Sequence, residues 1–198
     1  MYKVFFNQKP LILTTEIIKN DDSCPLFYIK FSVTEKIVSA LKKKSINSVI
    51  LYHPKKDKLE IHFNKLFPQV EAAGGLVINE SNQYLLIYRN NKWDLPKGRM
   101  FKKEMIIDAA KREVEEETSV KDLIVLKKLP ITHHIFKRNH KYKHKKTYWY
   151  LMKTSYNGKL IPQAKEGIKK AVWKDKSEIN VLMKNAYKNI EILFDQVL

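Results

Sequence analysis

The chain has 198 residues, of which 44% are hydrophobic, so it can build one ample core or two modest ones and is neither disordered nor fibrous. Cys24 is the only cysteine, which excludes an intramolecular disulfide and a cysteine-based zinc site, and no apolar run approaches the length of a membrane span. The opening MYKVFFNQKP lacks the hydrophobic region of a signal peptide, so we expect a cytoplasmic protein. The formal net charge of +17 implies affinity for polyanions.

A small α/β region is predicted for residues 1–68. Residues 2–6 and 11–14 have the pattern of two strands joined as a hairpin. A helix is predicted from 32 to 43, because it opens with Ser-Val-Thr-Glu, the order of a capping box, and a strand is predicted over 48–53. A separate domain and an extension of the main sheet both fit this pattern. Dimerisation, a lid over the substrate and partner binding all remain open as its role.

A second domain is predicted over residues 69–198, since the pattern changes at Phe67 and Pro68. Residues 70–78, which are apolar or glycine apart from Glu71, indicate a buried strand, and a polar turn separates it from a second strand at 84–88. The next segment, 93–98, contains a proline and a glycine and therefore predicts a constrained loop. Such a loop suits the delivery of a substrate to the helix that follows.

Apolar residues at helical intervals predict an amphipathic helix over 104–117. Glu113, Glu116 and Glu117 share one face of this helix, where like charges repel and crowd its partly negative C-terminal end. Each effect costs only a few tenths to about 1 kcal/mol, but all of them act in the same direction. A divalent cation such as Mg²⁺, which prefers carboxylate and phosphate oxygens, would offset the repulsion. A solvated acidic face is the alternative interpretation.

The rest of the second domain is predicted to be strands followed by one helix. The strands are expected at 123–126, 131–136, 147–154 and 170–173, with a turn at Asn157-Gly158. A last helix begins near Ser177 and should pack on the sheet through apolar residues at helical spacing, namely Ile179, Leu182, Met183, Ala186, Ile190, Leu193, Phe194 and Val197. The predicted fold class is α/β, with a mixed β-sheet sandwiched between helices.

A basic loop is predicted at residues 137–146, between two of these strands, because the segment contains six Lys and Arg residues and no acidic residue. Such a loop could clamp the phosphates of a highly charged substrate, whereas a basic hairpin loop with no specific ligand is the alternative. Four histidines lie in the same neighbourhood, but their spacing matches no metal-binding pattern. The candidate substrate-binding residues are Lys137, Arg138 and Lys145 in the loop, and Arg89 and Lys97 ahead of the helix.

A longer motif spans residues 98–120. Its fixed positions are Gly98, Glu104, Arg112, Glu113, Val114, Glu116, Glu117 and Val120, with Ser119 at one further position. At these residues the chain resembles the Nudix hydrolase family, whose box has a glycine where Ser119 stands. That glycine normally closes the helix in a left-handed conformation, which costs serine something but rarely forbids it. The resemblance implies the Nudix fold.

The same resemblance implies a role for each box residue. Glu113, Glu116 and Glu117 would bind Mg²⁺ or Mn²⁺. Arg112 and Glu104 would pair to hold the loop against the helix, while Gly98 would allow the tight turn that starts the loop. A bound metal would neutralise phosphates, acidify the attacking water and orient it in line with the leaving oxygen.

The general base has three candidates. Glu116 and Glu113 belong to the box, and members of the family also use a glutamate from a later loop. Here that residue would be Glu166, within residues 162–168, although a solvated loop glutamate is an equal alternative.

Nudix enzymes cleave a nucleoside diphosphate linked to another group, or a related polyphosphate, by attack of water on phosphorus. Residues 93–98, 146–152 and 162–168, with Trp173, look like the branch that cleaves dinucleoside polyphosphates and diphosphoinositol polyphosphates. Lys165 departs from that branch, where an acidic residue is usual. The expected partner is therefore a phosphate-rich nucleotide or polyphosphate small molecule.

A second hypothesis is a non-catalytic nucleotide-sensing or RNA-binding Nudix protein. The net charge of +17 and the additional N-terminal region motivate it. Such regulators often lose box carboxylates, and this chain keeps them, which favours the enzyme. Hydrolysis at the 5′ end of RNA would satisfy both sets of features. No membrane partner is expected, and a homodimer remains open.

Overall fold

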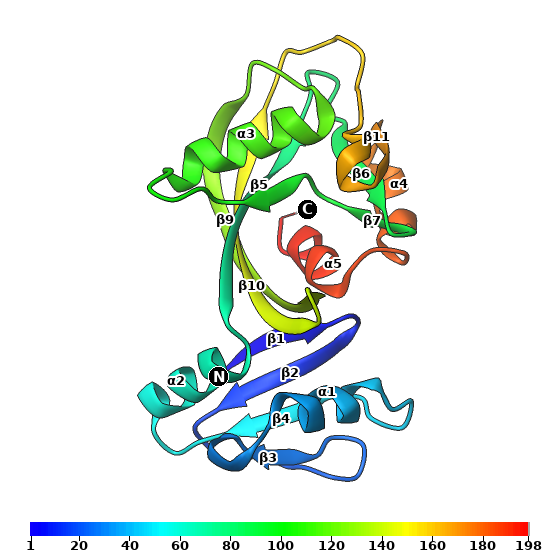
Figure 1. Cartoon of the computed structure of the whole chain (residues 1–198). Helices are drawn as coiled ribbons and strands as arrows, with labels where there is room; N and C mark the ends of the chain where they lie inside the picture. The colour runs from blue at the N-terminus through cyan, green and yellow to red at the C-terminus, as the bar shows by residue number, and fades with distance from the viewer. Residues whose placement is uncertain (198) are drawn as a thin grey trace. The chain divides into compact units, whose positions relative to one another are not determined.

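The computed structural model describes residues 1–197, which form two compact units (Figure 1). The first unit contains Met1–Val70 together with His133–Lys145, and the second contains Glu71–Thr132 and the chain from Lys146 onward. Residues 133–145 are the tip of a long hairpin, so a division of the sequence at residue 68 does not include them in the first unit. None of the helices within residues 1–197 is long and apolar enough to cross a membrane.

The first unit contains a mixed sheet in the strand order β9-β1-β2-β4-β3. Strands β1 (Tyr2–Phe6) and β2 (Lys9–Thr14) form an antiparallel hairpin, as predicted. Strand β4 (Val49–Tyr52) runs parallel to β2 and to β3 (Leu26–Tyr28), which lies at the edge. The hairpin tip joins the sheet because Phe5 of β1 pairs in parallel with His134.

Two helices complete the first unit, α1 (Thr34–Lys42) and α2 (Lys56–Leu66). Their apolar residues, including Ile37 and Phe63, join the strands in one core. The predicted capping box is wrong: Val33 precedes α1 as its N-cap, and the Ser32 hydroxyl instead donates to the carbonyl of Tyr28 at 3.0 Å. Helix α2 was not predicted, because only Leu59 and Phe63 along it are buried, too few to produce a clear helical period.

The second unit is built on a sheet in the order β11-β6-β5-β10-β9. Its long strands are β5 (Gln69–Ile78), β6 (Tyr84–Arg89), β9 (Ile124–Arg138), β10 (Lys141–Lys153) and β11 (Ile168–Lys174). Two short strands, β7 (Lys92–Asp94) and β8 (Lys97–Arg99), pair with β6 and β5 and hold the segment that was predicted as a constrained loop.

Helices cover both faces of this sheet. Leu85 and Val77 pack in a core that includes α3 (Ile106–Thr118), whereas their neighbours Leu86 and Leu76 pack in a second core with α4 (Lys176–Met183) and α5 (Lys188–Asp195). Successive strand residues therefore point to opposite cores, as the pleat requires. Figure 1 shows α3 and α5 beside this sheet. The predicted class, a mixed sheet between helices, is confirmed.

Several elements of the second unit differ from the prediction, and the two strands predicted at 123–126 and 131–136 are the single strand β9. Residues 137–146 do not form a loop, because β9 continues to Arg138 and β10 begins at Lys141, which leaves only Asn139 and His140 in the turn. Strand pairing in a hairpin outweighs the charge of this segment. The C-terminal helix is also two helices, since residues 184–187 separate α4 from α5. Both helices nevertheless bury apolar residues in the same core. The apolar residues therefore continue at helical intervals in the sequence across the break.

Candidate active site

Helix α3 carries most of the candidate site. It ends at Ser119, whose φ of 65° and ψ of 11° place it in the left-handed region. Ser119 thus adopts the conformation for which glycine is preferred, and its N–H donates to the carbonyl of Glu115 at 2.8 Å. The Thr118 hydroxyl donates to the carbonyl of Val114 at 2.6 Å and fixes the last turn. The serine substitution in the motif leaves the helix end intact.

Arg112 organises three carboxylates near the middle of α3. Its Nε and Nη2 donate to the two oxygens of Glu104 at 2.7 and 3.0 Å, a bidentate pair. Its Nη1 donates to Glu113 at 2.7 Å and to Glu116 at 3.0 Å. The guanidinium also lies 4.1 Å from the ring centre of Phe101. The segment before α3 is thereby fastened to the helix, and the Arg112 hydrogen bonds hold the pKa of Glu104 below its usual range.

Gly98 lies against the carboxylate of Glu113. It sits in β8 paired with Ala73, and a Cβ at this position would collide with the carboxylate oxygens of Glu113. Within residues 1–197 the glycine in the left-handed region is Gly167, so Gly98 contributes close approach to Glu113 without a positive φ. Burial raises the pKa of Glu113, because its charged form has lost part of its solvation.

Glu117 is the most deeply placed of the motif carboxylates. Its side chain is 0% exposed and accepts a hydrogen bond from the backbone N–H of Lys97 at 2.9 Å. Arg89 Nη1 lies 3.4 Å from its other oxygen. Burial raises the pKa of Glu117 to about 7, despite the nearby positive charges. A cation bound beside Glu117 would compensate for this desolvation.

A buried ion pair lies next to Glu117. The Lys97 ammonium donates to Asp94 at 2.5 Å, and both side chains are 3% exposed or less. The Lys97 ammonium, a candidate for substrate contact, is paired with Asp94 in this structure, and its contact with a substrate stays a prediction. Asp94 was missed by sequence reasoning. The one signal in the sequence is that Asp94 lies three residues before Lys97. This spacing allows an ion pair only in some backbone conformations, and the sequence does not give the conformation of this segment.

Arg89 and Glu166 extend the same group of charges. Arg89 lies within 3.7 Å of both Asp94 and Glu166, in addition to its contact with Glu117. Glu166 ends a short 3₁₀ helix, Ala164–Glu166, and its side chain is 53% exposed. The structure therefore brings Glu166 into the neighbourhood of α3, although the two are about fifty residues apart in the chain.

The remaining candidates lie elsewhere. Lys137, Arg138 and Lys145 belong to the first unit, where Lys137 and Lys145 lie over the rings of Tyr142 and Phe136. Their contact with a substrate stays a prediction.

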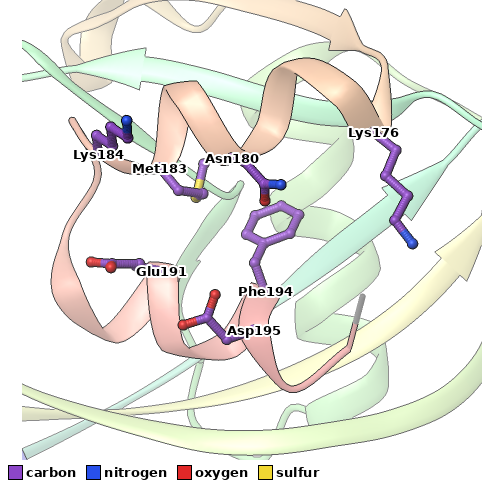
Figure 2. Close-up of a pocket in the computed structure, with 7 residues that line it drawn as sticks. All are labelled: Lys176, Asn180, Met183, Lys184, Glu191, Phe194 and Asp195. Carbon is purple, nitrogen blue, oxygen red and sulfur yellow. The ribbon is translucent and has the colours of Figure 1, made fainter.

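A pocket of about 410 Å³ between α4 and α5 is separate from these residues (Figure 2). Met183 and Phe194 line its apolar part, while Lys184 and Glu191 lie at one side. It contains no residue of the motif.

Residues 68–196 match the family model of the NUDIX domain, which is more than half of the chain. The chain belongs to the Nudix family. Family membership identifies it as a Nudix pyrophosphohydrolase, and Nudix hydrolases generally use a divalent metal and act on nucleotide or polyphosphate substrates.

Solved Nudix structures share the fold of the second unit at low identity. The MutT protein of Methanosarcina mazei Go1 is 20% identical with a TM-score of 0.52, covering 66% of this chain and 93% of its own. A NUDIX hydrolase from Nitrosomonas europaea is 20% identical with a TM-score of 0.50, covering 65% and 88%. The Nudix hydrolase RenU of M. smegmatis is 14% identical with a TM-score of 0.51, covering 66% and 85%. At these identities the likeness shows the fold alone.

The residues of this Nudix domain fit a divalent cation by donor chemistry. Glu113, Glu116 and Glu117 offer hard oxygen ligands, and burial has raised the pKa of two of them, which a cation would reverse. Among residues 1–197, however, no three acidic, histidine or cysteine side chains already converge as a metal-ligand group. Arg112 instead occupies the space between Glu113 and Glu116 through its Nη1. A cation bound by these two carboxylates would compete with Arg112 for them.

Proposed function

We propose that this Nudix hydrolase cleaves a pyrophosphate bond in a phosphate-rich nucleotide or polyphosphate, a dinucleoside polyphosphate or similar, with Mg²⁺ or Mn²⁺ and by attack of water on phosphorus. The single observation that carries the proposal is the group of three carboxylates on α3. Two are buried with raised pKa values, and all three are held by cationic or backbone donors.

Glu113, Glu116 and Glu117 are the proposed metal ligands. A bound cation would neutralise phosphate oxygens and lower the pKa of the attacking water. Glu117 is the fixed member, because two donors hold it in a fully buried position. Glu116 is the adjustable member, with a side chain 45% exposed.

Proton removal from water is assigned to a carboxylate at the solvent side of this group. Glu116 meets that requirement, and Glu113 is the less accessible choice within the box. Glu166 is the third candidate, since Arg89 lies 3.7 Å from it and it is more than half exposed. Arg112 acts on the reaction by orienting Glu113 and Glu116, so it is a positioning residue here.

The substrate class follows from charge. A substrate with several phosphates suits the cationic candidates for its contact. Arg89 lies within 3.7 Å of Glu117 and Glu166, and a phosphate could displace one of these carboxylates. The sequence likeness to the dinucleoside and diphosphoinositol polyphosphate branch supports the narrower choice. Lys165 departs from that branch, where an acidic residue is usual.

The test is a substrate panel with Mg²⁺: diadenosine polyphosphates, ADP-ribose, diphosphoinositol polyphosphates and 5′-triphosphate RNA. Products are followed for the natural protein and for Glu116→Gln, with Glu115→Gln as the matched control. Glu115 is one residue away but pairs with Lys121 on an exposed surface. We expect cleavage of one polyphosphate class, a loss of about 10²- to 10⁴-fold in Glu116→Gln, and unchanged turnover in Glu115→Gln.

Undiminished turnover in Glu116→Gln would reject the assignment of the site. Silence across the panel in the natural protein would instead favour the non-catalytic nucleotide-sensing or RNA-binding function. Cleavage of the triphosphate RNA alone would identify the 5′ end of RNA as the substrate. A cytoplasmic location and a homodimer stay predictions.

A further inference from the structure

An aromatic cluster lies at the carboxyl ends of the parallel strands in the first unit. Tyr28 ends β3 and pairs in register with Tyr52, which ends β4, and their ring centres are 5.9 Å apart. Phe31 follows in a 3₁₀ turn, with its ring 5.4 Å from Tyr28 in an edge-on arrangement. His53 stacks on Tyr28 at 5.4 Å and approaches His62 of α2 at 5.6 Å. The carboxyl ends of parallel strands are the usual ligand-binding edge of an α/β sheet.

One side of the cluster is buried, at His53, and the other side is exposed to solvent, at Phe31. His53 is only 6% exposed, and its Nδ1 accepts a hydrogen bond from the backbone N–H of Lys55 at 3.0 Å, which fixes the ring stacked on Tyr28. Phe31, by contrast, is 76% exposed, and Tyr28 and Tyr52 are half-buried. A phenylalanine so exposed gains little from folding, because its apolar surface remains in water.

One lysine lies beside a ring of this cluster, and further lysines follow it in the chain. The Lys30 ammonium lies 5.3 Å from the ring centre of Phe31. After Tyr52 the chain continues through Lys55, Lys56 and Lys58, all exposed, against a single acid, Asp57. The first unit as a whole contains 17 Lys and Arg residues and 6 Asp and Glu residues. The first unit therefore has both an exposed aromatic ring and an excess of positive charge.

We propose that this aromatic and basic surface of the first unit binds single-stranded nucleic acid. Bases would stack on Phe31 and Tyr28, and Lys30, Lys55 and Lys56 would contact the backbone phosphates. Stacking on aromatic side chains, together with a cationic path for the backbone, is how sequence-tolerant single-strand binding is achieved. The excess of positive charge favours a polyanion as the ligand. The exposed aromatic surface favours a polyanion with bases that can stack on it. This binding is independent of the hydrolysis proposed for the second unit.

Fluorescence anisotropy with a labelled twelve-nucleotide oligouridine, and with the matching DNA oligonucleotide, measures this binding directly. Phe31→Leu keeps apolar bulk but removes the aromatic face, whereas Phe31→Trp keeps it. We expect Phe31→Leu to weaken binding at least about fivefold and Phe31→Trp to preserve it. The RNA and DNA arms show which backbone is preferred.

The charge contribution is tested with Lys55→Ala/Lys56→Ala against Lys127→Ala/Lys128→Ala, a pair of exposed lysines in β9 of the second unit. The logarithm of the binding constant falls linearly with the logarithm of the salt concentration. Loss of Lys55 and Lys56 should reduce the magnitude of this slope by about 1.4, at about 0.7 for each phosphate contact, and loss of Lys127 and Lys128 should not change it. Equal binding by Phe31→Leu and the natural protein, equal effects of the two lysine pairs, or no binding at low salt would each overturn the proposal. Pyrophosphohydrolase activity on a small substrate is measured in parallel, so failure of one function is distinguished from failure of the other.

Discussion

The two units of this protein treat charge in opposite ways. In the second unit, the key charges are buried and paired: Lys97 with Asp94, and Glu117 between the N–H of Lys97 and Arg89. In the first unit, cations such as Lys55 and Lys56 are exposed to solvent. Buried pairs resist screening by salt and hold atoms in place, whereas exposed cations attract distant polyanions and are screened.

This difference fits the two functions proposed for the units. Carboxylates that are buried in a site lose solvation, and fixed hydrogen-bond donors must offset that loss. The carboxylates of α3 have such donors. A surface that captures a polyanion gains from exposed cations that shed their counterions. The predictions below alter the buried charges of the second unit or their close contacts, most of them beside a control substitution elsewhere in the same unit.

The largest effect is expected for Lys97→Met. It leaves Asp94 buried without its closest partner, so the free energy of unfolding should fall by about 3–5 kcal/mol. Lys127→Met, at an exposed position, should change it by no more than about 0.5 kcal/mol. Urea unfolding measures both. Similar values for the two variants would show that the Lys97 pair is not structurally important, and Asp94→Leu/Lys97→Met should recover part of the loss.

The pH dependence of stability reports on Glu117. Its folded-state pKa of about 7 exceeds the ordinary value of 4.5, so the folded protein retains a proton that the unfolded chain has lost. In metal-free buffer, the free energy of unfolding should therefore fall as pH rises from 4.5 to 7, by up to about 3 kcal/mol. Glu117→Gln should remove this dependence, and saturating Mg²⁺ should reduce it. A difference between variant and natural protein that does not change with pH would contradict the assignment.

Gly98→Ala tests the close approach to Glu113. The added Cβ collides with the carboxylate, which must move, and a displacement of about 1 Å near the reacting groups can lower turnover about 10²-fold. Steady-state kinetics and a thermal melt together separate lost activity from lost folding. Gly158→Ala, where a Cβ would meet the ring of Tyr156, is the control for crowding away from α3. Full activity in Gly98→Ala would show that Glu113 tolerates displacement.

The smallest effect is expected for Glu104→Gln. The neutral amide weakens the bidentate pair with Arg112, so the guanidinium that orients Glu113 and Glu116 becomes less constrained. Turnover should fall about tenfold, with little change in stability. Asp108→Asn removes an exposed charge from the first turn of α3 and should leave turnover unchanged. Equal effects of the two substitutions would indicate a general dependence on charge.

The sequence predicted helix α3 and its carboxylate face because both depend only on local spacing, and it predicted the two-sided sheet from strand and helix periods. The Asp94 and Lys97 pair could not be predicted, because burial of both side chains arises from the surrounding cores. The strands at residues 137–146 were missed because their lysines suggested a loop. The division between α4 and α5 was missed because buried Met183, Ala186 and Ile190 continue the helical spacing across it.

The most direct test is Mn²⁺ binding, followed by the electron paramagnetic resonance signal of the free ion, in the natural protein, Glu116→Gln and Glu115→Gln. If the carboxylates of α3 hold the metal, the natural protein and Glu115→Gln bind Mn²⁺ equally and Glu116→Gln binds at least about tenfold more weakly. Equal binding by all three proteins would place the metal elsewhere and contradict the proposed active site.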